Sequence, residues 1–294
     1  YVGTTQTKTL TANSVVMVLS NVIFNYILIF GKFGIPALGI TGAAIGSSLA
    51  ELVSLIFFIV YTRTRCNREK YGLDKAARID IQELKGMMPV CSWTTIQHVI
   101  SVSTWFIFFM YIEHLGERSL AVSNIVRGVS GLLWMVTEAF ASTCSTLVSN
   151  IIGAGREDKV WSLLKRILKL SYGVVMSCAL LFCIFPSAVI SIYTDIPDLI
   201  PSTIPSMLVM CSSYLFTVGA MVLFQAVSGT GSTKAAFRLE MAALAIYTLY
   251  CTVIVGILKL DIAICWTAEH VYALILLICS WTYMRSGRWK NRQI

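Results

Sequence analysis

The chain has 294 residues, of which 56% are hydrophobic and only 13% are charged, and its mean hydropathy is +0.75. A water-soluble protein of this composition would need an implausibly large core, whereas a lipid bilayer accepts apolar surface directly, so we predict an integral membrane protein. The net charge of +8 would suggest nucleic acid in a soluble protein, but basic residues beside membrane spans mainly set topology.

Eight mostly apolar stretches are long enough to cross roughly 30 Å of hydrocarbon. They are residues 13–30, 37–61, 88–112, 120–152, 164–193, 202–229, 236–257 and 261–284. Backbone groups cannot bond to water inside lipid, so each stretch is predicted to be a helix. The predicted fold class is therefore an all-α, polytopic membrane protein. The nine cysteines show no metal-ligand or disulfide spacing, so we expect neither a zinc site nor a disulfide framework.

Lysine and arginine are distributed unequally between the two sides that these spans define. Only Lys32, Arg118 and Lys259 fall on one side, and Arg127 lies at the edge of the fourth span. The other nineteen of the 23 basic residues fall on the opposite side, seven of them in the polar stretch 62–85 between the second and third spans. The asymmetry predicts that this stretch and both ends of the chain are cytoplasmic.

A short internal repeat indicates a larger parent. Residues 3–9 resemble residues 229–235, and two spans follow each copy. Four spans precede the second copy after the polar stretch, so symmetry predicts four missing spans before Tyr1 and a parent of about twelve helices in two six-helix lobes. We expect residues 1–62 to form the last two helices of an N-terminal lobe and 63–87 a cytoplasmic linker. Residues 88–285 would form a six-helix C-terminal lobe, and 286–294 a basic cytoplasmic tail.

Three runs resemble a known family. Residues 20–31 and 33–44 look like the fifth-to-sixth helix region of the MATE (multidrug and toxic compound extrusion) family, and residues 149–156 resemble the end of its eighth helix. The similarity extends over essentially the whole chain in the family's order. It implies a cation-coupled exporter of amphipathic, often cationic compounds, with two pseudo-symmetric lobes around a cleft that opens alternately to each side.

The first two spans offer small and amide side chains. The pair Gly42 and Gly46 forms a small-residue face that lets helices approach closely, which most often means packing. Asn21 and Asn25 lie one turn apart on one helix face. Their amides could bond a neighbouring helix or line the cleft, and the sequence leaves both readings open.

The fourth span carries a polar stripe with an acid near its middle. Trp134, Glu138 and Ser142 recur at helical spacing on this stripe. An intramembrane carboxylate costs at least about 2.5 kcal/mol unless it is neutralised, which is why such acids tend to be functional. Glu138 is therefore a candidate for binding a proton or a cation, with a structural acid as the alternative.

The third and sixth spans depart from the family pattern. In one branch of the family, acids occupy the places where counting from Pro89 and Gly229 puts Gln97 and Thr217. A sodium site of that kind in the second lobe is therefore in doubt. Both residues stay candidates for the substrate or ion pathway.

Two further acids lie in the last two spans. Glu240, with Tyr247 two turns deeper on its face, could serve the pathway or reach the membrane interface. Glu269, beside His270, lies nearer the middle of the last span. A proton relay and a satisfied structural pair are both open readings for Glu269.

These observations predict a secondary antiporter, not an enzyme, which exports amphipathic or cationic xenobiotics in exchange for H⁺ or Na⁺ by alternating access. We expect a multi-pass protein of the cytoplasmic (inner) membrane that is monomeric when complete, contacts the lipid bilayer, binds no nucleic acid and needs no cofactor or metal. The alternatives are a lipid-linked oligosaccharide flippase of the same superfamily and, more remotely, a membrane-embedded enzyme using His98 or His270. A flippase cleft would be strongly basic, which disfavours that alternative.

Overall fold

A computed structural model describes residues 1, 6–66 and 81–290 of the chain. Most of the predicted linker, the end of the predicted tail and the first three residues of the repeat copy 3–9 lie outside these residues. The described part is helical, and eight of its helices are long and apolar enough to cross a membrane. The predicted fold class is thus confirmed.

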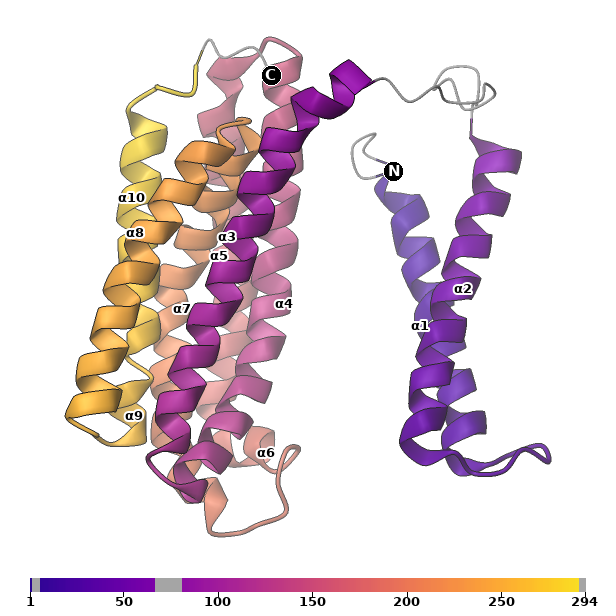
Figure 1. The fold of residues 1–294 in the computed structure, drawn as a ribbon, viewed down its shortest axis with the longest axis vertical. Coiled ribbons are helices and arrows are strands. Elements are labelled where there is room, and N and C mark those ends of the chain that lie inside the picture. Colours follow the sequence, from indigo (N-terminus) through magenta and orange to yellow (C-terminus); the bar gives the residue numbers. More distant parts are fainter. Residues whose placement is uncertain (2–5, 67–80, 291–294) are drawn as a thin grey trace. The chain divides into compact units, whose positions relative to one another are not determined.

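The contacts within the chain divide it into two compact units, Tyr1–Ile81 and Gln82–Ile294. The first unit is a helical hairpin of α1 (Thr7–Phe30) and α2 (Gly39–Arg65), which run side by side in Figure 1. Gly31 ends α1 in the left-handed conformation that glycine adopts readily, and its N–H bonds to the carbonyl of Ile27.

The hairpin packs closely because glycine faces the partner helix. A Cβ atom on Gly42 would lie 2.6 Å from the carbonyl oxygen of Leu28, and one on Gly46 would collide with the side chain of Asn25. The predicted small-residue face is therefore a packing face between α1 and α2.

The second unit contains six long helices and several short elements (Figure 1). In chain order they are α3 (Ile81–Glu113), α4 (Glu117–Gly153), the 3₁₀ turn η1 (Glu157–Lys159), α5 (Val160–Ile184), α6 (Pro186–Ile190), α7 (Leu199–Gly229), α8 (Thr233–Cys251), the π-helical turn η2 (Thr252–Ile257), α9 (Ile262–Cys265) and α10 (Ala268–Arg285).

Three predicted spans are interrupted in the structure. The stretch 164–193 was expected to be one helix, but α5 ends at Ile184 and Pro186 begins the short helix α6, since proline restricts the residue before it and favours a first helical turn. The stretch 236–257 changes from α-helix to π-helix at Thr252. The last span breaks at Trp266, between α9 and α10.

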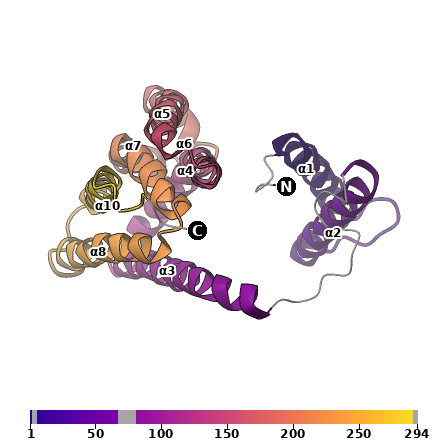
Figure 2. The same cartoon turned by 90° about the horizontal axis from the view of Figure 1, so that it is seen from above.

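Helix α7 is the centre of the second unit. It packs against α4, α5, α8 and α10, and it lies between α5 and α10 in Figure 2. Gly229 at its end permits close contact, because a Cβ there would lie 2.5 Å from the carbonyl oxygen of Ser145 on α4. The hydroxyl of Ser149 also donates to the carbonyl of Gly229 at 2.7 Å. Helices α4, α5, α8 and α10 are therefore positioned by their contacts with α7.

Candidate functional site

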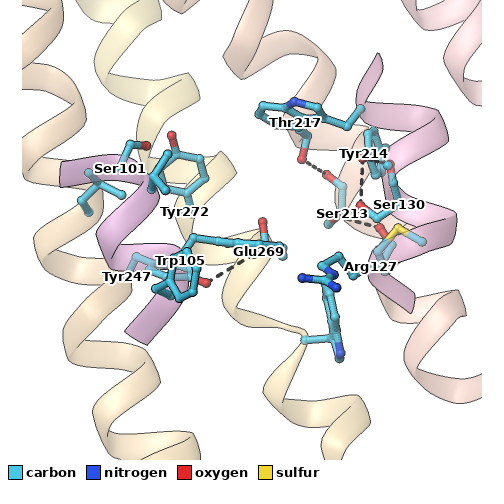
Figure 3. Close-up of a pocket in the computed structure, with 17 residues that line it drawn as sticks. Ser101, Trp105, Arg127, Ser130, Ser213, Tyr214, Thr217, Tyr247, Glu269 and Tyr272 are labelled. Atoms are coloured by element: carbon cyan, nitrogen blue, oxygen red, sulfur yellow. Dashed lines mark hydrogen bonds between the residues drawn. The ribbon is translucent and has the colours of Figure 1, made fainter. Parts of the chain in front are cut away.

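A cavity of about 460 Å³ lies within the second unit, between α3, α4, α7, α8 and the start of α10 (Figure 3). Its lining combines aromatic rings, small hydroxyls, one acid and one base. The lining residues are Ser101, Val102, Trp105, Phe106, Arg127, Ser130, Gly131, Trp134, Met210, Ser213, Tyr214, Thr217, Leu244, Tyr247, Trp266, Glu269 and Tyr272. A volume of this size is typical of pockets for drug-sized ligands.

Glu269 is the carboxylate that faces this cavity. It lies in the first turn of α10 and is partly buried. The hydroxyl of Tyr247 on α8 donates to its Oε1 atom at 3.4 Å, as Figure 3 shows. Tyr247 itself is buried, so this bond fixes the carboxylate at the wall. A carboxylate with so few bonds in apolar surroundings is stabilised by a proton or by a cation.

The aromatic lining is held in place by contacts between helices. Tyr214 on α7 donates to the carbonyl of Ser130 on α4 at 3.0 Å. The indole N–H of Trp266 donates to the hydroxyl of Ser123 at 3.3 Å. Tyr247 and Tyr272 pack edge to face with ring centroids 5.9 Å apart. These bonds orient the polar ends of the rings and leave apolar surface toward the cavity.

Arg127 is the base of the cavity lining. Its guanidinium carbon lies 5.2 Å from the ring centroid of Phe109 and 5.9 Å from that of Trp105, both on α3. The stacking holds the cation by cation–π contact. It also connects α4 to α3.

Glu240 lies in a polar cluster beside the cavity. This residue of α8 is 4% exposed. Its Oε1 atom accepts hydrogen bonds from Ser101 on α3 at 2.8 Å and from Tyr272 on α10 at 3.5 Å. Gln97 and His98 on α3 face the same carboxylate. Ser101 and Tyr272 also line the cavity, so the cluster adjoins it directly.

Glu138 is not among the residues that line the cavity. Its Oε1 atom accepts a hydrogen bond from Gln225 on α7 at 3.3 Å. His98 on α3 lies near both Glu138 and Glu240. The acid at the centre of the predicted polar stripe therefore lies outside the cavity lining, one helical turn along α4 from the lining residue Trp134.

The nine candidate residues from the sequence fall into three groups. Four of them line the cavity: Trp134, Thr217, Tyr247 and Glu269. Glu138 and Glu240 lie near His98, and Gln97 faces Glu240. Asn21 and Asn25 lie in the first unit, where Asn21 donates to Ser47 on α2 at 3.2 Å and Asn25 donates to Asn21 at 2.9 Å. In the described hairpin, these amides therefore serve contacts within α1 and between α1 and α2.

Several lining residues were not identified from the sequence, chiefly Trp105, Tyr214, Trp266 and Tyr272. A signal did exist for each of them. Tyr272 follows Glu269 by three residues and Trp105 follows Ser101 by four, so each shares a helix face with a polar residue. Tyr214 and Trp266 likewise precede the candidates Thr217 and Glu269 by three residues, but aromatic residues at such spacings are common in apolar spans and were not singled out.

The comparisons with known proteins agree with this architecture. The model of the MatE family matches residues 94–253. The transporter YisQ of Bacillus subtilis, described as uncharacterized, is 23% identical over 63% of the chain and 40% of its own length. A probable multidrug resistance protein, NorM of Thermotoga maritima, is 24% identical over 72% of the chain and 46% of its own length. The chain thus spans about half the length of the curated relatives it matches.

Solved structures share the fold. A mutant of the MATE transporter VcmN from Vibrio cholerae superposes with a TM-score of 0.83 at 16% identity, over 99% of the chain and 65% of its own. A transporter of the MOP superfamily from Pyrococcus furiosus, described as having a binding pocket of reverse polarity, gives a TM-score of 0.80 at 15% identity, over 96% and 63%.

Proposed function

The chain belongs to the MatE family of multidrug and toxic compound extrusion transporters, and from this premise we propose that it acts in a secondary antiporter. The antiporter exports amphipathic or cationic compounds in exchange for H⁺ or Na⁺ by alternating access. The observation that carries the proposal is the aromatic cavity of the second unit with one carboxylate, Glu269, on its wall.

The cavity is chemically suited to an amphipathic cation. The faces of Trp134, Tyr214 and Tyr247 offer cation–π contacts and apolar area. Glu269 offers the negative charge that distinguishes a cation from a neutral compound. The hydroxyls of Ser130 and Ser213 are already bonded to neighbouring groups, so they demand little hydrogen bonding from the substrate. Such a lining tolerates compounds of different shapes.

Substrate export is coupled to ion entry when the substrate and the coupling ion bind to the same carboxylate. A proton or Na⁺ on Glu269 removes the charge that holds the cationic substrate, so ion and substrate compete for one group. A coupling ion that binds one conformation more tightly then shifts the equilibrium between the two orientations of the cleft. Tyr247 keeps the carboxylate in position during this exchange.

Glu240 is the second acid of the proposed mechanism. Gln97 stands where the family resemblance implies an acid, and the carboxylate of Glu240 faces it from α8. In the proposed mechanism, Glu240 on the seventh span takes the part of the acid that one branch of the family carries on the third span. Glu138, which also lies near His98, remains a third candidate.

A flippase for lipid-linked anions is the alternative function, and Arg127 in the cavity lining is the observation that favours it. A pyrophosphate group generally needs several charge-assisted bonds. Arg127 is the single base in the described lining, and Glu269 would repel the anion. The antiporter is therefore the better-supported function.

The remaining assignments follow from the same premise. We place the protein in the cytoplasmic membrane as a multi-pass protein, with both ends and residues 63–87 on the cytoplasmic side, because basic residues concentrate there. We also propose that the complete protein acts as a monomer, needs no cofactor, binds no nucleic acid and is not an enzyme.

The direct test is uptake of ethidium into everted vesicles that contain the complete gene product, with proton and sodium gradients imposed separately, because an exporter transports into the lumen of such vesicles. Accumulation driven by one gradient and abolished when that gradient is collapsed would support the antiporter. Vesicles without the protein provide the control. No gradient-driven transport of ethidium, together with transport of a lipid-linked pyrophosphate, would replace the antiporter by the flippase.

A further inference from the structure

A second cavity, of about 380 Å³, lies between α5, α7 and α10. Its lining residues are Leu168, Tyr172, Gly219, Leu223, Leu277, Ile278 and Trp281. Gly219 follows Thr217 of the first cavity by two residues, which corresponds to about 200° around the helix. The two cavities therefore lie on opposite faces of α7. In Figure 2, α5 and α10 flank α7, and we call the space between them the α5–α10 crevice.

The close packing of α5 and α10 against α7 in the crevice requires a glycine at position 219. A Cβ atom on Gly219 would lie 2.7 Å from the hydroxyl oxygen of Tyr172 and 3.1 Å from a methyl carbon of Leu277. The hydroxyl of Tyr172 donates to the carbonyl of Leu215 on α7 at 2.8 Å, which fixes this ring as one wall. The crevice is thus a defined feature of the packing.

The crevice opens onto an apolar surface of the bundle. Leu208 and Leu215 lie on the same stripe of α7 as Gly219, and Leu215 is 55% exposed. On the other wall, the side chains of Ile278 and Trp281 are 52% and 43% exposed. In a membrane protein, an exposed apolar channel of this kind faces lipid tails.

One end of the crevice carries tryptophan and positive charge. The rings of Trp161 on α5 and Trp281 on α10 meet edge to face with centroids 5.5 Å apart. Lys165 lies on the same face of α5 as Trp161 and Leu168, and Arg285 follows Trp281 by one turn on α10. Both basic residues are exposed. Tryptophan beside lysine and arginine is typical of the headgroup level of a membrane.

We propose that the α5–α10 crevice is a binding site for an anionic phospholipid. One acyl chain lies along α7 between Tyr172 and Ile278, and the phosphate and acidic headgroup contact Lys165 and Arg285. Basic pockets between transmembrane helices bind anionic headgroups in this way. The site does not depend on the transport mechanism, because it lies on the face of α7 opposite the first cavity.

The test uses the complete gene product in vesicles that contain phosphatidylglycerol or phosphatidylcholine, each with a diazirine in one acyl chain. After illumination, mass spectrometry locates the labelled peptides. Phosphatidylglycerol is expected to label peptides from α5 and α10 about tenfold more strongly than phosphatidylcholine, because two bases face its headgroup. Equal labelling by both lipids, or labelling by neither because another segment fills the crevice, would overturn the proposal.

Two pairs of variants distinguish lipid binding in the crevice from labelling at other lipid-exposed surfaces. Ile278→Trp fills the crevice and should abolish the labelling, whereas Leu170→Trp, at a side chain 61% exposed elsewhere on α5, should not. The double variant Lys165→Ala with Arg285→Ala should lose the preference for phosphatidylglycerol. The matched double variant Arg166→Ala with Arg288→Ala should keep it. Indistinguishable results within either pair would contradict the site.

Discussion

At the scale of single residues, the cavity combines one carboxylate with a wall of aromatic rings. Glu269 supplies charge, while Trp134 and Tyr214 supply polarisable surface from two other helices. Under the proposed function, the charge would give selectivity for cations, and the rings would give affinity that depends little on the shape of the ligand. The two contributions can be tested separately.

The aromatic contribution is tested by Trp134→Ala. Its ring is 41% exposed and lines the cavity, so its loss removes cation–π and apolar contact. We expect the affinity for ethidium, measured by fluorescence titration of the purified complete gene product, to fall about fivefold. Met135→Ala, at a neighbouring side chain outside the cavity lining, is the control and should bind as the wild type does. Equal affinity in the two variants would remove Trp134 from the site.

The cluster around Glu240 makes a prediction about stability. Ser101→Ala removes the hydroxyl that donates to Glu240 at 2.8 Å. The buried carboxylate then has one hydrogen bond fewer to offset the cost of its burial. We expect the free energy of unfolding to fall by about 1–3 kcal/mol, seen as a lower melting temperature. Ser103→Ala, on the exposed side of α3, is the matched control.

A second comparison shows whether the Ser101 effect acts through the acid. In a Glu240→Gln background, the same Ser101→Ala change should cost less, because a neutral amide needs the hydroxyl less than a carboxylate does. An undiminished cost in that background would mean that Ser101 contributes by packing alone.

Sequence reasoning identified the acids and favoured Glu138. Charge inside an apolar span does not by itself distinguish Glu138 from Glu240 and Glu269. Which of them faces a cavity depends on the rotation of each helix, and that rotation is set by packing among helices distant in sequence. Glu138 occupies the most regular polar stripe, yet it bonds to Gln225 on α7, whereas Glu269 faces the aromatic lining.

At the scale of elements, the α1–α2 hairpin tests the role of small residues. Gly42→Val would place its Cβ atom 2.6 Å from a carbonyl oxygen of α1, which is backbone and cannot rotate away. We expect the melting temperature of the complete gene product to fall, with a cost of about 1–3 kcal/mol. Ala44→Val, at an exposed position of the same helix, should leave it unchanged. A stable Gly42→Val protein would contradict the packing of the hairpin.

Hydropathy located every long helix, because a continuous apolar run is the strongest signal that a sequence carries. It missed the interruptions within those runs. Pro186 is a recognisable helix breaker. The residues on both sides of it are apolar, however, so hydropathy predicted one continuous helix. The π-helical turn at Thr252 was not predicted, because such turns are rare and interrupt a run that otherwise reads as one helix.

At the scale of the whole molecule, the distribution of basic residues predicts orientation. We expect a cysteine at Ile35, between α1 and α2, to react with a membrane-impermeant maleimide from outside the cell. A cysteine at Arg288, after α10, should react only when the cytoplasmic side is exposed. Both are introduced after the nine native cysteines have been replaced. Reaction of both from the same side would overturn the predicted topology.

The site as a whole could not be predicted, because it is assembled from five separate helices. Ser101 on α3 and Tyr272 on α10 are far apart in sequence and meet at Glu240. Counting from motifs brought Gln97 and Thr217 to notice, and the structure places Thr217 in the cavity lining and Gln97 at Glu240. Residue spacing alone does not show which residues from different helices meet; the structure does.

The central claim is that Glu269 couples the ion gradient to export. The measurement is ethidium uptake into everted vesicles, which reports export activity, by the complete gene product carrying Glu269→Gln. Glu113→Gln, at an exposed acid at the end of α3, is the control. We predict that Glu269→Gln reduces export to the level seen without a gradient, while Glu113→Gln exports as the wild type does. Export by Glu269→Gln that still follows the proton or sodium gradient at wild-type rate would contradict the claim.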